Sequence, residues 1–480
     1  MNYDKFTSQK RAIVGFSGFD PLPIVAPLFD WQAHVLKWAV RKGRCALFED
    51  CGLGKTAQQL EWASQVFRKT GGSVLVLAPL AVAHQTKSEG EKFGISVNVA
   101  ESDDDISGPG IYITNYEKVE KFDCDQFAGV VLDESSILKS FTGKTRRLIT
   151  ELFSETPYKL CCTATPSPND YTELGQHADF LGVCTPMQML CTYFINDTFN
   201  TGDWRLKKHA ESDFWKWLAG WAACVSSPSD IGFPDDDYIL PPLNMRDLVV
   251  EVDQTQDKQD EDLFRIATLS ATTMHKEMRI TAPARASAVA ELVNDSDEAW
   301  IVWCNTNQES DLLKAAIPEA VEVKGSDSSK VKRDRLASFS SGESRVIITK
   351  PSIAGYGLNW QHCANVAFVG LSYSFEDFYQ ALRRSYRFGQ KKEVNAVIVQ
   401  AETEGAIVKA IQKKIKQHEK MQESMKTAAK ELTMDETSNV EMKTDIEKHE
   451  GDGWTLYHGD CVRVARNAIE DQSVGLSVFS

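Results

Sequence analysis

The strongest constraint on the fold is a series of short apolar runs that alternate with helix-like segments. Nearly continuous apolar runs of this length are typical of strands covered on both faces, as in a parallel sheet. Their alternation with helices predicts an α/β layered domain. The runs fall into two blocks, at about 20–182 and 290–402. They are Val74–Ala78, Ile111–Thr114, Val130–Leu132 and Lys159–Thr163, then Trp300–Cys304, Arg345–Thr349, Val366–Val369 and Ala396–Val399.

Residues 1–19 are expected to form an N-terminal arm before the first block. The segment 183–289, which separates the two blocks, has a different composition. We expect a mostly helical insertion and linker there. Its first part, Cys184–Asp237, is rich in aromatic residues and ends in what looks like an irregular loop, Phe233–Pro242. The aromatic side chains could stack nucleic-acid bases, but packing in a helical core is the favoured interpretation. They are Trp204, Phe214, Trp215, Trp217 and Trp221.

Residues 403–450 are predicted to form a helix followed by a polar linker. Ile407, Ile411 and Ile415 recur every fourth residue among many lysines in Glu404–Leu432, which indicates an amphipathic helix. We expect this helix to brace the second block, although an independent coiled coil is the alternative. The polar, mixed-charge composition after Leu432 is that of a linker.

Composition and charge narrow the class of protein. The 480 residues carry a formal net charge of −15, which argues mildly against coating nucleic acid but permits a local basic cleft. The 11 cysteines show no paired CxxC elements, so we expect reduced thiols rather than a zinc site. The sequence also lacks an apolar signal segment or a membrane-spanning run. We expect a cytoplasmic protein with no membrane partner.

A glycine-rich turn at Glu49–Thr56 lies between the strand-like Cys45–Phe48 and the helix-like Ala57–Phe67. Backbone N–H groups in such a turn can wrap phosphates, and the helix N-terminus adds partial positive charge. Lys55 can reach the β- and γ-phosphates, and the Thr56 hydroxyl can ligate Mg²⁺. The first position of the full GxxxxGK[ST] pattern is Glu49 instead of glycine.

Two adjacent acids, Asp133 and Glu134, end the apolar run that begins at Gly129. A carboxylate at the end of such a strand lies at the mouth of an α/β sheet, where ligands bind. Asp133 is placed to hold Mg²⁺, largely through water, and Glu134 to orient and deprotonate an attacking water. An isolated acidic pair would more simply be a solvated turn; the upstream phosphate loop favours catalysis.

Taken in order, these motifs resemble those of superfamily 2 helicases, and within them the SNF2-like translocases, over about residues 20–402. Asp50–Thr56 resembles the family's DEMGLGKT loop, and Thr163–Asn169 resembles its LTGTPxxN motif. Ser352–Trp360 and Gln380–Gln390 resemble the GLNL-ending motif V and the QAxxRxxRxGQ motif. Weaker matches are Phe29–Gln32 upstream of the loop, Leu77–Leu80 and Thr114–Tyr116 as motifs Ia and Ib, and Leu240–Pro242 after the insertion.

The resemblance implies two RecA-like lobes in tandem that bind and hydrolyse ATP with Mg²⁺. It assigns adenine recognition to Gln32, nucleotide contacts to Gly52, Gly54 and Gly357, and catalytic roles to Gln380, Arg384 and Arg387. A guanidinium suits the charge that spreads over the γ-phosphoryl oxygens. Arginines on the second lobe would complete the site only when the lobes close. Without the companion motifs these arginines would read as a solvated basic helix face.

In relatives, motifs Ia, Ib, IV and V line the nucleic-acid face. Small polar side chains and backbone N–H groups there can contact phosphates without reading bases. His84 could equally be a packed or surface histidine. The residues carried over are Pro79, His84, Thr114, Asn115, Thr165, Lys350, Ser352 and Asn359.

The segment 451–480 resembles the opening of a DNA amino-methyltransferase, through Leu456–Val462 and Asp471–Ser480. Neither a PPY motif nor an FxGxG loop is present, and Gly475 stands where Asp is usual. The resemblance implies a motor that belongs to a longer motor–methyltransferase protein, in which S-adenosylmethionine binds only the longer chain. An ordinary strand and helix packed on the motor is the alternative. The methyltransferase resemblance also leads us to expect a bacterial or phage origin.

Three hypotheses for function follow. The first is an ATP-dependent translocase on double-stranded DNA, which we expect to act as a monomer. The second is a strand-separating DNA or RNA helicase of the same superfamily. The third is a scaffold that binds ATP without hydrolysing it, which the water-orienting Glu134 argues against.

Overall fold

The structure is a computed structural model that describes residues 17–79, 82–140, 142–196, 204–235, 238–251, 271–355, 357–433, 447–451 and 454–458. It divides the chain into two compact units. One unit comprises Phe16–Asp435, and the other comprises Met1–Gly15 with Glu436–Ser480. The larger unit holds two parallel sheets, so the predicted pair of α/β blocks is confirmed.

The first sheet has seven strands in the order β3-β4-β2-β5-β6-β1-β9, and every neighbouring pair is parallel. Parallel neighbours need crossover connections, which here run largely through helices. The strands are β1 (Arg44–Glu49), β2 (Ser73–Ala78), β3 (Val97–Val99), β4 (Ile111–Asn115), β5 (Phe127–Asp133), β6 (Tyr158–Cys162) and β9 (Ala222–Val225).

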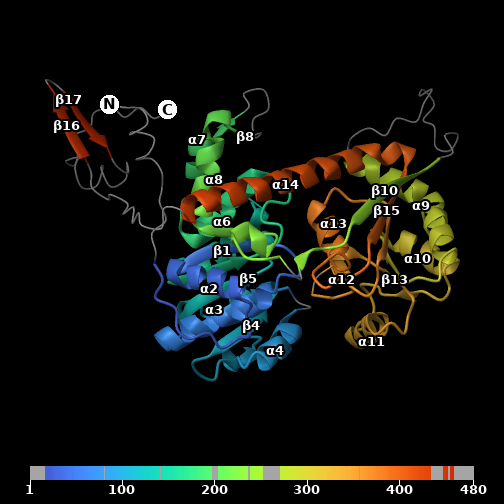
Figure 1. Cartoon of the computed structure of the whole chain (residues 1–480), viewed down its shortest axis with the longest axis horizontal. Coiled ribbons are helices and arrows are strands. Elements are labelled where there is room, and N and C mark those ends of the chain that lie inside the picture. Colours follow the sequence, from blue (N-terminus) through green and yellow to red (C-terminus); the bar gives the residue numbers. More distant parts are fainter. Residues whose placement is uncertain are drawn as a thin grey trace. The chain divides into compact units, whose positions relative to one another are not determined.

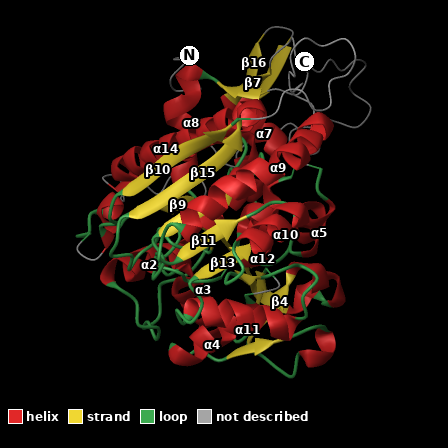
Figure 2. Cartoon of the chain, turned by 90° about the vertical axis from the view of Figure 1, so that its right-hand side faces the viewer, coloured by secondary structure: helices red, strands yellow, loops and turns green. Residues whose placement is uncertain are grey.

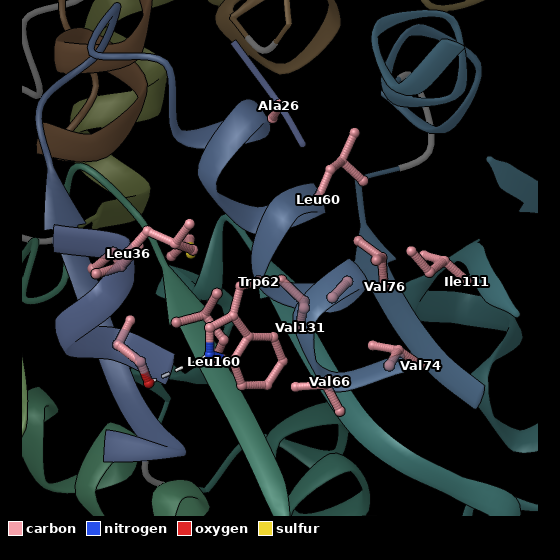
Figure 3. Close-up of a cluster of buried hydrophobic side chains, with 14 of the residues drawn as sticks. Ala26, Leu36, Leu60, Trp62, Val66, Val74, Val76, Ile111, Val131 and Leu160 are labelled. Atoms are coloured by element: carbon pink, nitrogen blue, oxygen red, sulfur yellow. Dashed lines mark hydrogen bonds between the residues drawn. The ribbon is translucent and has the colours of Figure 1, made fainter. Parts of the chain in front are cut away.

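Helices pack around this sheet, and we call the sheet and these helices lobe 1. They are α2 (Asp30–Lys42), α3 (Lys55–Thr70), α4 (Ala83–Lys92), α5 (Lys144–Leu152), α6 (Leu174–Leu181), α7 (Pro186–Tyr193) and α8 (Glu211–Ala219). Figure 3 shows part of the core, where Trp62 of α3 lies among Leu36, Val131 and Leu160. Trp62 is fully buried, and its indole N–H donates to the Ala39 carbonyl at 3.4 Å. Burying such side chains contributes about 1.5–3 kcal/mol each.

The second sheet has six strands in the order β10-β15-β14-β11-β13-β12, again with parallel neighbours. We call it lobe 2 together with its helices (Figures 1 and 2). The strands are β10 (Leu243–Val250), β11 (Trp300–Trp303), β12 (Val321–Glu322), β13 (Val346–Thr349), β14 (Asn365–Val369) and β15 (Val394–Ala401). The helices are α9 (Ala271–Asn294), α10 (Asn307–Ala316), α11 (Ser329–Ser340), α12 (Pro351–Ala354) and α13 (Phe375–Leu382).

Alternate residues of β11 enter different cores, as the two-residue period of a strand requires. Ile301 and Trp303 pack in the core that also receives α13. Trp300 and Val302 pack in the core on the other face, against α9 and α10. A strand covered on both faces must be apolar throughout, which is why the sequence pattern of this block is continuous.

The boundaries of the lobes differ from those inferred from sequence. β9 joins the edge of the first sheet and β10 joins the edge of the second, although both lie within the segment 183–289. A short antiparallel pair, β7 (Phe194–Asn196) with β8 (Trp204–Leu206), also lies there. The described part of the segment contains more helix than strand, in α7, α8 and most of α9, and its strands β9 and β10 extend both sheets.

The aromatic residues of this segment form a packed cluster, as favoured from the sequence. Phe214 and Trp221 are fully buried, Trp215 and Trp217 are nearly so, and Trp204 is half-buried. Trp217 contacts Trp221 edge-on, with ring centroids 5.4 Å apart. The buried rings are thus occupied by one another and not displayed for stacking on bases.

A long helix, α14 (Gly405–Thr433), follows the last strand of lobe 2 and returns to lobe 1 (Figure 1). Its first turns bury Ile407 and Ile411 in the lobe 2 core. Farther along, α14 packs on α8, and the Tyr171 hydroxyl of lobe 1 donates to the Gln417 carbonyl at 2.8 Å. The helix contacts both lobes, so the expected bracing helix is confirmed.

The smaller unit contains an antiparallel pair, β16 (Glu447–Gly451) with β17 (Trp454–His458). The segments on which the methyltransferase resemblance rests lie mostly outside the described residues, including all of 459–480. Within the part of the chain that the structure describes, no helix combines the length and apolarity needed to cross a bilayer.

Candidate active site between the two lobes

The glycine-rich turn folds as a loop between the end of β1 and the start of α3. Gly52 and Gly54 have φ values of +88° and +80°, a left-handed region that side chains disfavour. A Cβ on Gly54 would lie 2.5 Å from the Gln32 amide nitrogen. The Lys55 ammonium donates to the carbonyls of Glu49 at 2.8 Å and Asp50 at 3.1 Å. The loop is thus closed around its own lysine, beside the N-terminus of α3.

Gln32, expected to read adenine, lies against this loop. Its amide nitrogen donates to the Leu53 carbonyl at 2.7 Å, and its amide oxygen accepts from the Phe29 N–H at 2.9 Å. Both ends of the amide are therefore engaged with backbone, and the side chain holds the loop to the start of α2. Adenine recognition by Gln32 stays a prediction.

The end of β5 places the two predicted acids side by side. Asp133 accepts a hydrogen bond from the Gln59 amide at 2.8 Å, and its carbonyl accepts one from the Tyr116 hydroxyl at 2.7 Å. Glu134 has left-handed backbone angles, with φ +55° and ψ +55°. Its carboxylate accepts from Thr163 at 3.3 Å and from the Gln380 amide of lobe 2 at 3.5 Å.

Burial dominates the electrostatics of these acids. Loss of solvent raises the pKa of Glu134 to about 7, partly offset by the nearby Lys55 ammonium. Burial also raises the pKa of Asp133, and the hydrogen bond from Gln59 opposes that rise. A carboxyl group with its pKa near neutrality suits a residue that accepts a proton from water.

Lobe 2 contributes Arg384 and Arg387, just after α13. Both guanidinium groups donate to the Leu358 carbonyl, at 2.9 Å and 3.0 Å, which ties them to the glycine-rich stretch that contains Gly357. Arg384 also donates to the side-chain oxygen of Gln380 at 3.0 Å. Burial lowers the pKa of Arg387 to about 10, so it still carries its charge at neutral pH. Arg384 is 5% exposed, which excludes a solvated helix face.

Direct contacts join the lobes on either side of these groups. Arg383 pairs with Asp50 of the loop, and the Tyr379 hydroxyl donates to the same carboxylate. Farther from the loop, Glu376 of α13 accepts hydrogen bonds from Ser136 and Lys139, which follow the acidic pair. The cleft is therefore held closed at two places by charged side chains.

A cavity of about 250 Å³ lies between the lobes. It brings together nine residues singled out from the sequence: Gly52, Gly54, Lys55, Thr56, Asp133, Glu134, Gly357, Arg384 and Arg387. Gln32 and Gln380 border the site through the loop and through Glu134, but they do not line the cavity. The opposed lysine and arginines can neutralise a polyphosphate, and the acids can manage a metal ion and a water molecule.

Sequence reasoning missed one wall of this cavity, which α4 provides. Gln85 and Glu89 line it, with the Gln85 amide donating to the Glu89 carboxylate at 2.9 Å. Cys51 also lines it, and its thiol donates to Gln380 at 3.5 Å. No motif marked Gln85 or Glu89, although their four-residue spacing places both on one face of a helix.

The donor set fits Mg²⁺, which prefers oxygen ligands and keeps several waters. The Thr56 hydroxyl and the Asp133 carboxylate line the same cavity. Among the residues that the structure describes, no cluster of three or more His, Cys, Asp or Glu side chains could enclose a metal. Phosphate oxygens and water would therefore complete the coordination of a magnesium ion at this place.

The predicted nucleic-acid residues are divided between surface and interior. Ser352 and Asn359 are exposed on lobe 2, and the Lys350 ammonium donates to Asn307 at 2.7 Å. Thr114, Asn115 and Thr165 are buried, so in this arrangement their side chains offer no surface to a polymer. Pro79 is half-buried after β2, and the side chain of His84 lies outside the described residues.

Two family models match the chain, one in each lobe. A family model described as an SNF2-related domain matches residues 31–192, and one described as a helicase conserved C-terminal domain matches residues 284–389. A curated relative, the DNA annealing helicase and endonuclease ZRANB3 of Bos taurus, is 23% identical over 420 residues. The match covers 78% of this chain, which spans only 38% of the length of that relative.

Among solved structures, the Sulfolobus solfataricus SWI2/SNF2 ATPase core in complex with dsDNA is similar at 17% sequence identity. The match covers 87% of this chain and 96% of that one, with a TM-score of 0.40.

Proposed function

We propose that the chain is a nucleic-acid-dependent ATPase of the SNF2-like branch of the superfamily 2 helicases, because models of the two domains match its two lobes, and that it moves along double-stranded DNA. ATP hydrolysis in the cleft between its lobes would drive the movement. One observation carries the proposal: the phosphate loop and acids of lobe 1 line the same cavity as Arg384 and Arg387 of lobe 2.

In the proposed reaction, Lys55 leaves the carbonyls of Glu49 and Asp50 and binds the β- and γ-phosphates of ATP. Arg384 and Arg387 stabilise the charge that develops on the γ-phosphoryl oxygens. Glu134 orients the attacking water and takes its proton. Thr56 and Asp133 would hold Mg²⁺, which supplies charge neutralisation to the phosphates.

Gln380 and Thr163 are proposed to orient Glu134, since both donate to its carboxylate. Both donate to the same carboxylate oxygen, Oε2, and one donor comes from each lobe, so both hydrogen bonds form only when the lobes are together. Arg384 is held in turn by Gln380. Catalysis would therefore depend on lobe closure, and release of the products would let the lobes part.

Duplex DNA is proposed as the track on the basis of family and motif. The motifs at Thr163–Asn169 and Gln380–Gln390 have their SNF2-like forms, and the curated relative is named as acting on DNA. Lys350, Ser352 and Asn359 are the proposed phosphate contacts on lobe 2, because their side chains reach the surface. Such contacts are independent of base sequence, as a motor requires.

The test is the steady-state ATPase rate alone and with saturating duplex DNA, single-stranded DNA or RNA. Duplex should stimulate most, and Lys55→Ala and Glu134→Gln should each lower the rate at least about 100-fold. Displacement of a third strand from a triplex should accompany hydrolysis, without separation of a labelled duplex. Stimulation by single strands or RNA with duplex separation would instead identify a helicase. ATP binding without hydrolysis would favour the scaffold.

The motor–methyltransferase fusion is proposed from the resemblance of segment 451–480 alone. In that case a longer protein containing this chain should bind S-adenosylmethionine, and this chain by itself should not. Equilibrium dialysis with labelled S-adenosylmethionine, on both lengths of the protein, tests the proposal. No binding by the longer protein would leave the segment as an accessory of the motor.

A further inference from the structure

Gln59 lies deep in lobe 1, where neither the motifs nor the proposed reaction gives it a role. It follows Lys55 by four residues and Thr56 by three, so the helical period of α3 places all three on one face. Its side chain is 1% exposed. A fully buried amide requires partners, because an unpaired polar group in the interior is costly.

The amide nitrogen of Gln59 donates to Asp133 Oδ1 at 2.8 Å, across from α3 to the end of β5. Its amide oxygen is also buried and has no hydrogen-bond partner among the described residues. The donor occupies one carboxylate oxygen of Asp133 and fixes the plane of the group. The other oxygen is left to accept hydrogen bonds from water around a metal ion.

The nature of the donor matters. A lysine or arginine in this place would neutralise the Asp133 carboxylate and weaken its attraction for a cation, whereas an amide orients it and leaves its charge. Mg²⁺ keeps several waters, and an Asp133 carboxylate of fixed orientation can bind the hydrated ion through them. Gln59 does not itself line the cavity, so it acts on the site through Asp133.

The adjacent Gln58 provides an internal comparison. It is equally buried, and its amide nitrogen donates to Glu49 Oε2 of β1 at 2.7 Å. Its amide oxygen is likewise buried and without a partner among the described residues. The two glutamines therefore share burial and chemistry, and they differ in the carboxylate that each one holds.

We propose that Gln59 is a positioning residue for magnesium, which holds Asp133 in the orientation that binds the hydrated ion beside Thr56. The inference rests on the proposed ATPase function, because that function places the ion at Asp133. It predicts that loss of the Gln59 amide weakens metal binding and leaves the contacts of the nucleotide with the phosphate loop unchanged.

The experiment measures binding of a fluorescent non-hydrolysable ATP analogue to the full chain, as a function of Mg²⁺ concentration and in EDTA. Gln59→Met keeps the length of the side chain and removes the amide. It should raise the half-saturating Mg²⁺ concentration about 10-fold or more, with affinity in EDTA unchanged. Gln58→Met, the matched control, should leave the Mg²⁺ dependence at the wild-type value.

An unchanged Mg²⁺ midpoint in Gln59→Met, or an equal shift in both variants, would overturn the role of Gln59 while the ATPase proposal stands. Absence of any Mg²⁺ effect on the wild type would overturn both. If Gln59→Met shows no cooperative thermal transition, Gln59→Asn replaces it, since the shorter amide stays polar but cannot reach Asp133. The same midpoint shift is then expected.

Discussion

Asp50 of the phosphate loop and Arg383 of lobe 2 form an ion pair buried between the lobes. The guanidinium Nε donates to the carboxylate Oδ1 at 3.1 Å, and each residue is 7% exposed. The Tyr379 hydroxyl donates to the same oxygen. The loop that would receive phosphate is thus already attached to the segment of lobe 2 that carries Arg384 and Arg387, the proposed catalytic arginines.

Removing one partner of this pair should open the cleft. In Arg383→Met, the Asp50 carboxylate would stay buried without its cation, a penalty of about 3–5 kcal/mol that opening relieves. Small-angle X-ray scattering without nucleotide should show a larger radius of gyration than for wild type. Adding Asp50→Asn should restore part of the compaction. An unchanged scattering profile in the single variant would show that the pair does not hold the lobes together.

The ATPase rate should depend on the ionisation of Glu134. Burial raises the pKa of this residue to about 7, and only its ionised form can accept a proton from water. We expect kcat to rise about 10-fold per pH unit below 7 and to level off above about 8. The measurement is a pH profile of kcat with saturating duplex. A profile of the same shape in Glu134→Gln would assign the ionisation to another group.

Glu49 should make stability depend on pH. This residue, where glycine is usual, is fully buried, and desolvation raises its pKa from 4.5 to about 7. Since the unfolded carboxyl ionises first, stability is highest below pH 4.5 and falls as pH rises towards 7. The free energy of unfolding of Glu49→Gln, relative to wild type, should therefore increase by roughly 2 kcal/mol as the pH rises from 5 to 8. Thermal unfolding at both pH values tests this, and a constant difference would exclude it.

Trp217 should act in packing and not in base stacking. It contacts Trp221, Phe214 and Tyr193, with ring centroids 5.4–5.7 Å apart. Trp217→Ala should cost about 3–5 kcal/mol of stability, without changing the DNA affinity of the folded protein. The half-buried Trp204 offers the comparison, and Trp204→Ala should cost much less. Normal melting with lost single-strand binding in Trp217→Ala would revive the stacking interpretation.

The two α/β blocks could be located in the sequence because their inner strands are apolar on both faces. β10 escaped prediction for the opposite reason. It pairs with β15 alone, and Asn244, Met245, Arg246 and Asp247 are all exposed, so no continuous apolar run marks it. An edge strand satisfies only half of its backbone groups in the sheet and needs only partial burial. Sequence patterns therefore identify central strands more readily than edge strands.

Within the site, local motifs located the groups that depend on a loop or a strand end, such as Lys55 and Asp133. Gln59 and Glu89 acquire their positions only when α3 and α4 pack beside the end of β5, which no local spacing specifies. The burial of Thr114 was missed for the same reason. A polar residue at a strand end reads as accessible until its neighbours are placed.

The left-handed backbone of Glu134 has a consequence for any search for a more robust enzyme. Among described residues other than glycine, it alone has a positive φ, which costs about 1–3 kcal/mol for an ordinary side chain. Glycine or asparagine would relax that conformation and also remove the proposed base. Selection for heat resistance alone would therefore enrich inactive protein at this position, and a screen for durable variants must score turnover alongside survival.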